Sequence, residues 1–389
     1  MSLLFQAVIF GATYFSFTLW VQPWMAEFDA TRSEVLLLVV IMQLMSGIAG
    51  PLIGPAMDRY SVRHLVIVGA LLSSAALYLT AHASALWQVG LLYGGVLSIG
   101  TVLSGPLAAQ TLAARWFDER RGTAIGLSSV GTSIGGVVIP LLVGIWLADG
   151  NWRAAHMNLA IVVLVGVVPA VWWFVRNSPE AAGVAPEASA ATSEIAADYP
   201  DWTTLSLLKH PAFIGITLAV TPMIATTGAI QQNLAPFNTD LGIETTQTGL
   251  MVSVMAFVMV VGKIFFGMMA DRWQHSTLFA IAVVIVFAAL GLLLWQPTLP
   301  TMMVMAMLLG FGAGGFLPLL GAMVARQFGP ASFGRAMGLL GPFITLSAAG
   351  PLLAGYLRDT TGSYDASWWT FMAILSVSAL GLALLRRAG

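Results

Sequence analysis

The chain has 389 residues, of which 58% are hydrophobic and 8% are charged, whereas an ordinary soluble domain is about 25% charged. Nearly every stretch of about 20 residues is apolar, which excludes a pair of soluble domains and indicates membrane-spanning segments. The net charge of -1 gives no basic surface for nucleic acid. The absence of cysteine excludes disulfides, thiolate metal sites and cysteine nucleophiles.

Apolar runs between charged or Gly/Pro-rich breaks predict twelve spans along the chain. The runs do not alternate between apolar and polar residues as the strands of a transmembrane barrel do, so the spans must be helical. The first run has no basic leader and no cleavage site, and we expect it to be kept rather than removed as a signal peptide. The predicted spans are 3–28, 33–57, 65–81, 86–114, 122–148, 154–176, 210–238, 246–270, 277–296, 299–327, 333–358 and 365–386.

One long polar segment separates the first six spans from the last six. It is rich in Ala, Ser and Pro and carries several acidic residues, a composition typical of a flexible linker. The sequence therefore predicts an N-terminal bundle at residues 1–177, a cytoplasmic linker at 178–205 and a C-terminal bundle at 206–389.

Lys and Arg residues gather on one side of the predicted spans. With the N-terminus inside the cell, twelve of them lie inside and three lie outside. The positive-inside rule then predicts an inner (cytoplasmic) membrane protein with both termini and the linker in the cytoplasm. The outer three are Arg32, Arg153 and Arg358; the inner twelve are Arg59, Arg63, Arg115, Arg120, Arg121, Arg176, Lys209, Arg272, Arg326, Arg335, Arg386 and Arg387.

The two halves of the chain repeat one another. The segment from Gly54 to Arg59 (GPAMDR) recurs 213 residues later as Gly267 to Arg272 (GMMADR), and Pro106 and Pro318 lie 212 residues apart. Because six spans separate the copies, both copies have the same orientation. This predicts parallel repeats that enclose a site and rock around it.

These motifs resemble the major facilitator superfamily over essentially the whole chain. Gly54 to Arg63 is similar to that superfamily's signature between spans 2 and 3, and Gly267 to Arg272 is similar to its second copy. Gly11 to Phe17, Ala114 to Gly135 and Gly350 to Tyr364 resemble spans 1, 4–5 and 11 of monocarboxylate transporters and oxalate:formate antiporters. The resemblance implies an all-α membrane protein with twelve transmembrane helices in two six-helix bundles, acting as a secondary transporter by rocker-switch alternating access.

The chain departs from the monocarboxylate transporters in span 8. That family often has an Asp four residues before an Arg in this span, and the matching positions here hold Met259 and Lys263. The carboxylate that would carry a proton there is therefore missing. The basic residue that the antiporters have in span 11 has no counterpart between Gly338 and Leu357.

Lys263 is the one charged residue well inside a predicted span. A charge near the bilayer centre costs about 2.5 to 3.5 kcal/mol on insertion scales, so it usually marks a pathway or a binding site. The alternative is a lysine that snorkels to the membrane surface, roughly 10 Å away. We favour a cavity-facing lysine, because small residues share its helix face and such residues mark faces packed against other helices. The face comprises Gly249, Ser253, Ala256, Val260, Lys263 and Gly267.

The spans hold no carboxylate that would neutralise Lys263, so we expect the site to attract an anion. The compact charge of a lysine suits the single carboxylate of a monocarboxylate. Burial also disfavours the charged ammonium, so we expect Lys263 to take up a proton together with the anion. The alternative is a facilitator that exports a neutral or hydrophobic solute, such as a drug or lipid, with Lys263 serving helix packing.

Four polar residues complete the predicted substrate site around Lys263. Tyr14, Thr132 and Thr345 lie near mid-depth, and Asn233 lies in the outer half of span 7. For each of them the alternative is a hydrogen bond to its own helix or to a neighbour. Asn233 is also a candidate for an outer gate.

Asp58 and Arg59, with their second copies Asp271 and Arg272, are the predicted conformational latch. An acid on such a turn can face a helix N-terminus, where the macrodipole favours negative charge, and the resemblance implies that this contact holds the halves together when the cavity opens outward. The alternative is an ordinary helix-end cap.

The spans lack facing acid and base groups, so we expect no enzyme, metal site or cofactor. We expect a monomer whose partners are the anion, a proton and the bilayer.

Overall fold

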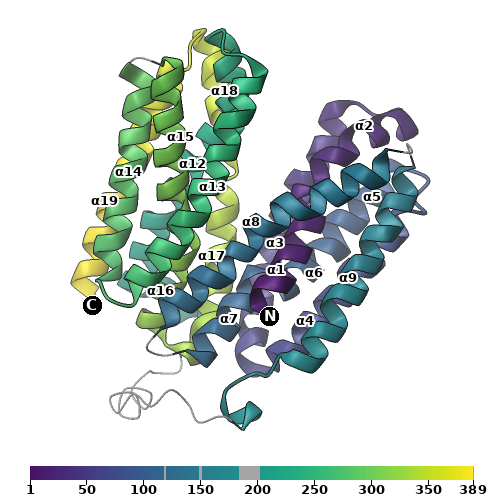
Figure 1. The fold of residues 1–389 in the computed structure, drawn as a ribbon. Coiled ribbons are helices and arrows are strands. Elements are labelled where there is room, and N and C mark those ends of the chain that lie inside the picture. Colours follow the sequence, from purple (N-terminus) through teal and green to yellow (C-terminus); the bar gives the residue numbers. More distant parts are fainter. Residues whose placement is uncertain (118–119, 149–150, 184–201, 296, 389) are drawn as a thin grey trace. The chain divides into compact units, whose positions relative to one another are not determined.

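The computed structural model describes residues 1–117, 120–148, 151–183, 202–295 and 297–388. Twelve helical spans in these ranges are long and apolar enough to cross a membrane (Figure 1), and each agrees with its predicted bounds within three residues. The prediction of a twelve-helix membrane protein is confirmed. The spans are Ser2–Phe28, Glu34–Arg59, Val62–Thr80, Leu86–Trp116, Arg121–Leu147, Trp152–Phe174, Pro211–Asp240, Gln247–Ala270, His275–Trp295, Leu299–Phe328, Pro330–Thr361 and Asp365–Arg386.

Four of the spans are built from several helical segments, which hydropathy did not predict. Two of these spans contain a stretch of π-helix, a geometry that often marks a functional site. The first span consists of α1 (Ser2–Phe10), η1 (Gly11–Phe15) and α2 (Phe17–Phe28), and the fourth of α5 (Leu86–Leu91), η2 (Leu92–Leu97), α6 (Ser98–Ser104) and α7 (Pro106–Trp116). The tenth consists of α15 (Leu299–Gly314) and α16 (Phe316–Phe328), and the eleventh of η4 (Pro330–Ser332), α17 (Phe333–Leu346) and α18 (Ala349–Thr361).

The first of two compact units comprises Met1–Asp201 and Phe328–Pro342. Its remaining long helices are α3 (Arg32–Arg59), α4 (Val62–Thr80), α8 (Arg121–Leu147) and α9 (Trp152–Phe174). Local chemistry sets where α3 begins: Thr31 and Glu34 each accept a hydrogen bond from the other's backbone N–H, which satisfies two free donors of the first turn. In this unit α4 packs against α6 and α9, α1 against α8, and α3 against α6.

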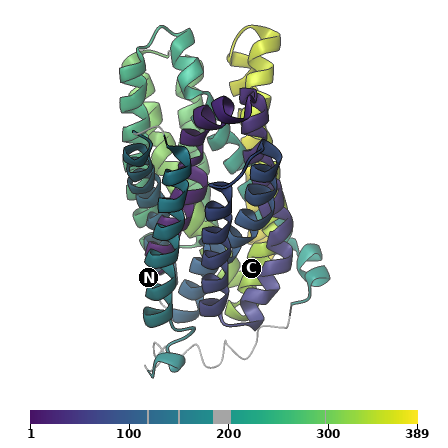
Figure 2. The ribbon, with the colours of Figure 1, turned by 90° about the vertical axis from the view of Figure 1, so that its right-hand side faces the viewer.

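The second unit comprises Trp202–Gln327 and Phe343–Gly389. It contains the short α11 (Thr204–Lys209) and the long helices α12 (Pro211–Asp240), α13 (Thr245–Ala270), α14 (His275–Trp295) and α19 (Asp365–Ala388). Here α14 packs against α15 and α19, α12 against α18, and α13 against α15. These pairs correspond span by span to those of the first unit, so the structure repeats as the sequence does. Figure 2 shows that the long helices within one unit run roughly parallel or antiparallel to one another.

The division between the units falls inside α17, between Pro342 and Phe343. The predicted C-terminal bundle, residues 206–389, contains this whole span, whereas the contacts assign the start of α17 to the first unit. Most of the predicted linker at 178–205 lies outside the described residues, and its boundaries stay a proposal. The described part includes the single turn η3 (Glu180–Ala182) and the start of α11.

Candidate functional site

Lys263 lies where α13 packs along α15. The two backbones approach closely because a glycine faces the contact: a Cβ atom added to Gly314 would lie 2.5 Å from the carbonyl oxygen of Met259 and 2.9 Å from the backbone nitrogen of Lys263. Lys263 is 5% exposed, and in the described part of the chain it is the one Lys, Arg, Asp or Glu that is buried. A snorkelling lysine ends in an exposed ammonium group, so this burial favours the interior interpretation.

The predicted small-residue stripe on α13 is not one packed face. Gly267 is buried near Lys263, but Gly249, Ser253 and Ala256 are exposed. Within the second unit, the whole stripe is therefore not packed against other helices. The contact with α15 includes Lys263 and also the adjacent Gly262, where an added Cβ atom would lie 2.5 Å from the carbonyl oxygen of Phe311.

Tyr14 lies on the π-helical η1 of the first span. Its side chain is half-buried, its hydroxyl is 3.4 Å from the hydroxyl of Ser46 on α3, and its ring is 4.8 Å from that of Phe10. The extra residue in a π-helical turn shifts the side chains that follow it, so η1 sets the direction in which Tyr14 points. Tyr14 stays a candidate for binding.

Thr132 is buried in α8, and its hydroxyl donates to the carbonyl oxygen of Ser129 at 2.8 Å. The hydroxyls of Ser16 and Thr227 likewise donate to carbonyl oxygens of their own helices. Such bonds satisfy the donor without a ligand. A hydroxyl keeps its acceptor lone pairs, so Thr132 stays a prediction as a binding residue.

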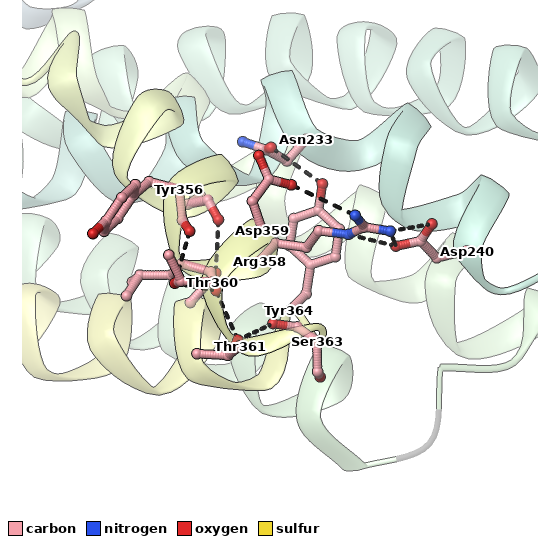
Figure 3. Close-up of polar contacts among 12 residues, drawn as sticks. Asn233, Asp240, Tyr356, Arg358, Asp359, Thr360, Thr361, Ser363 and Tyr364 are labelled. Carbon is pink, nitrogen blue, oxygen red and sulfur yellow. Dashed lines mark hydrogen bonds and ion pairs between the residues drawn. The ribbon is translucent and has the colours of Figure 1, made fainter.

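Asn233 on α12 is held in a buried hydrogen-bond network, of which Figure 3 shows the bond to Tyr364. Its amide nitrogen donates to the carbonyl oxygens of Ala229 at 3.0 Å and Pro351 at 3.2 Å, and its amide oxygen accepts from the hydroxyl of Tyr364 at 3.3 Å. Burial raises the pKa of Tyr364, which keeps that hydroxyl protonated as a donor. We therefore interpret Asn233 as a structural residue.

A bidentate ion pair lies beside this network. Arg358 on α18 donates to both carboxylate oxygens of Asp240 at 3.1 to 3.2 Å, across the end of α12 (Figure 3). Thr345 lies elsewhere, half-buried in the last turn of α17, where its carbonyl oxygen accepts from the backbone of Ala348 at 3.0 Å. The helix is interrupted there before α18 begins. Thr345 thus stays a candidate next to a break in the eleventh span.

Asp58 caps the N-terminus of α17. Its two carboxylate oxygens accept from the backbone N–H groups of Gly334 and Arg335, both at 2.7 Å. Arg115 on α7 donates to the carbonyl oxygens of Met57 and Asp58 at 2.6 and 3.0 Å, which fixes the end of α3 that carries the carboxylate. A carboxylate at this position satisfies two free donors and complements the positive end of the helix dipole.

Glycines bring α3 and α17 into backbone contact behind this cap. A Cβ atom added to Gly50 would lie 2.7 Å from the carbonyl oxygen of Gly338, and one added to Gly334 would lie 2.6 Å from that of Gly54. Added Cβ atoms on Gly54 and Gly338 would collide with the opposite backbone in the same way. Each helix thus contributes two glycines at a spacing of four, an arrangement that allows membrane helices to pack closely.

The other predicted latch residues differ from Asp58. Arg59 is exposed at the end of α3, and Arg272 is exposed just after α13. Asp271 is half-buried directly after the last residue of α13. The carboxylate of Asp58, rather than the neighbouring arginine, makes the contact with α17.

Two buried polar pairs of the first unit had no place in the sequence-based site. Gln6 on α1 donates to the hydroxyl of Ser128 on α8 at 2.7 Å, and Tyr93 lies 3.1 Å from Nε2 of His156. All four side chains are buried. Gln6 is a polar residue among apolar neighbours in the first span, and this contrast could have identified it from the sequence. The pairing of Tyr93 with His156 is not visible in the sequence, because 63 residues separate the partners.

Comparison with known proteins assigns the fold to a family. The family model of the Major Facilitator Superfamily matches residues 3–233 and 223–388. The chain belongs to the major facilitator superfamily. Monocarboxylate transporter 13 of Rattus norvegicus is 24% identical over 373 residues, covering 95% of this chain and 83% of that protein. The MFS transporter asaE of Aspergillus flavus is 25% identical over 325 residues, covering 81% and 69%.

A solved structure has the same fold. The proton:xylose symporter XylE gives a TM-score of 0.77 at 15% sequence identity, covering 97% of this chain and 93% of that chain. Together with the family match, this makes the chain a multi-pass membrane transporter and not an enzyme.

Proposed function

We propose that this major facilitator protein transports a small organic anion, a monocarboxylate, by rocker-switch alternating access. The burial of Lys263 in α13 carries the proposal. A fixed positive charge held away from water attracts an anion, and a lysine matches one carboxylate rather than two. Among the described residues no second buried cation would meet the other charge of a dicarboxylate.

Similarity to named relatives supports a carboxylate as cargo. Monocarboxylate transporter 13 of Rattus norvegicus aligns with 95% of this chain.

The proposed orientation follows the positive-inside rule. Both termini and the arginine-rich ends of the spans then face the cytoplasm, and the protein lies in the inner membrane.

We further propose that a proton accompanies the anion. Burial disfavours the charged form of an ammonium group, and a carboxylate beside it favours that form. Lys263 would then take up its proton as the anion arrives and lose it as the anion leaves. Uptake is expected to rise when the side from which the anion enters is made more acidic.

Uptake into proteoliposomes tests the proposal, with a panel of labelled monocarboxylates that includes lactate and pyruvate. A hydrogen bond to a charged group contributes about 1.5 to 3 kcal/mol, so Lys263→Met should weaken the apparent affinity for the anion by roughly 10- to 100-fold. The chain offers a matched control, because its other lysine, Lys209, is exposed at the end of α11. Lys209→Met should transport as the parent chain does.

Competition by amides separates this proposal from the transport of neutral solutes. Excess unlabelled acid should block uptake, whereas the corresponding amide, which has the same shape without the charge, should not. Equal inhibition by acid and amide, with full uptake by Lys263→Met, would overturn the anion proposal in favour of a neutral solute. Anion uptake without proton movement in the same vesicles would overturn only the coupling.

A further inference from the structure

A cavity opens at one end of the first unit. Its volume is about 540 Å³, within the range of roughly 300 to 1,000 Å³ that is usual for ligand sites. It lies between the start of α1, the ends of α7 and α9 and the start of α8. These are the ends of four spans on the side where most arginines lie.

The walls of this cavity are mainly apolar and continue onto the outer surface of the helices. Leu3, Leu112 and Trp116 line it together with Leu127 and Phe174. Leu127 is 55% exposed and Phe174 is 68% exposed. Such exposed apolar side chains on membrane-spanning helices suit contact with the acyl chains of the surrounding leaflet.

Two guanidinium groups stand at the same cavity. Arg120 is exposed at the start of α8, and Arg176 follows the end of α9. One nitrogen of Arg176 donates to the carbonyl oxygens of Trp173 and Val175 at 3.2 and 3.1 Å, which holds this side chain against the end of its helix. The described lining contains no Asp or Glu to neutralise either arginine.

We propose that this cavity binds an anionic phospholipid of the surrounding leaflet. Its phosphate would lie between Arg120 and Arg176, and one acyl chain would follow Leu127 and Phe174. A small monocarboxylate would leave the apolar walls in contact with water, and a zwitterionic lipid would bring a second positive charge toward the arginines. Basic pockets between membrane helices bind anionic headgroups for the same reasons. The proposed lipid site does not depend on the transported substrate.

Native mass spectrometry of the full chain, stripped of lipid and given phosphatidylglycerol or phosphatidylcholine, tests the site. We expect retention of phosphatidylglycerol and little retention of phosphatidylcholine. Each arginine near an anionic lipid contributes about fivefold in affinity, so the double variant Arg120→Gln/Arg176→Gln should bind phosphatidylglycerol roughly 25-fold more weakly. The matched double control Lys209→Gln/Arg386→Gln removes two exposed charges at other helix ends and should retain the lipid.

Two further arms separate the phospholipid from other occupants. Ala124→Trp fills the apolar wall without changing the charge, and it should also lower the retention of phosphatidylglycerol. Excess inorganic phosphate should not displace the lipid, because phosphate lacks the apolar contacts. Displacement by phosphate, equal retention of the two lipids, or equal losses in the arginine variant and its control would each overturn the proposal. Melting curves of each variant in the same detergent identify any that fail to fold.

Discussion

Two corresponding helices, α3 and α13, use the same repeat position in opposite ways. Moving 213 residues along the chain from Gly54 and Asp58 of α3 leads to Gly267 and Asp271 at the end of α13. The same step leads from Gly50 to Lys263. One copy of the repeat therefore has no side chain where the other has a long cation.

The difference shows how a duplicated scaffold can divide its tasks. A Cβ atom on Gly50 would lie 2.7 Å from a carbonyl oxygen of α17, so that position of α3 serves close helix packing. The corresponding position of α13 holds a long side chain, the buried Lys263. Packing at the first copy positions Asp58 against α17, and charge at the second supplies the proposed anion site.

The largest effect is expected from Gly50→Lys, which places in α3 the residue that α13 has at the corresponding position. Overpacking costs typically 1 to 3 kcal/mol and a buried charge about 2.5 to 3.5 kcal/mol, so the contact between α3 and α17 should be lost almost completely. A single cysteine reports the loss: the chain has no Cys, and Ser332 beside α17 is 5% exposed. In a Ser332→Cys background, Gly50→Lys should speed maleimide labelling more than a hundredfold.

A graded pair of variants controls for this result. Gly50→Ala should speed labelling by a smaller factor, since one methyl group already meets the backbone of Gly338. Gly144→Ala, at a helix position where an added Cβ meets nothing within 4 Å, should leave the rate unchanged. If Gly50→Lys labels as slowly as its parent, the glycine contact has no part in holding α17.

Asp58→Asn tests the part that charge plays in the contact with α17, because it removes the charge and keeps the shape of the side chain. Asp58→Asn keeps one acceptor oxygen but loses one of the two charged hydrogen bonds to the start of α17. A hydrogen bond to a charged group contributes about 1.5 to 3 kcal/mol, so we expect labelling of the same reporter to rise at least tenfold. Asp365→Asn, at an exposed acid in the first turn of α19, should have no effect. An unchanged rate in Asp58→Asn would reduce the contact to the glycines alone.

The smallest effect is expected at Asn233, in the unit that carries Lys263. Interhelical polar contacts in membranes average about 0.6 kcal/mol, so Asn233→Ala should lower the melting temperature by about one degree and leave anion affinity unchanged. Thr239→Ala, which removes a bond within α12 only, should change neither quantity. Weaker anion binding by Asn233→Ala at an unchanged melting temperature would restore the sequence-based prediction that Asn233 binds the substrate.

The spans and their repeat could be predicted because they depend on local composition. Twenty apolar residues leave few alternatives to a helix, and the motif that ends in Asp58 and Arg59 identifies the turn after the second span. The π-helical η1 around Tyr14 could not be predicted, because one extra residue in a turn scarcely changes the hydropathy pattern.

The partners of the site residues could not be predicted, because they depend on contacts between distant parts of the chain. Asp58 and Gly334 are 276 residues apart, and the residues around one do not indicate a contact with the other. Asn233 looked like a ligand for the same reason: the carbonyl oxygen of Pro351, which its amide nitrogen meets, lies 118 residues away. The charge of Lys263 was evident from its apolar surroundings, whereas the exposed half of the stripe on α13 became visible only in three dimensions.

The most direct test of the role of Lys263 is the dissociation constant of a monocarboxylate, measured by calorimetry on the purified chain. The acid should be the one that raises the melting temperature most in a panel, compared with its own amide. The parent chain and Lys209→Met should bind the acid equally well and the amide poorly, and folded Lys263→Met should bind the acid roughly 10- to 100-fold more weakly. Equal affinity of Lys263→Met and Lys209→Met for the acid would contradict the assignment of Lys263 as the anion site.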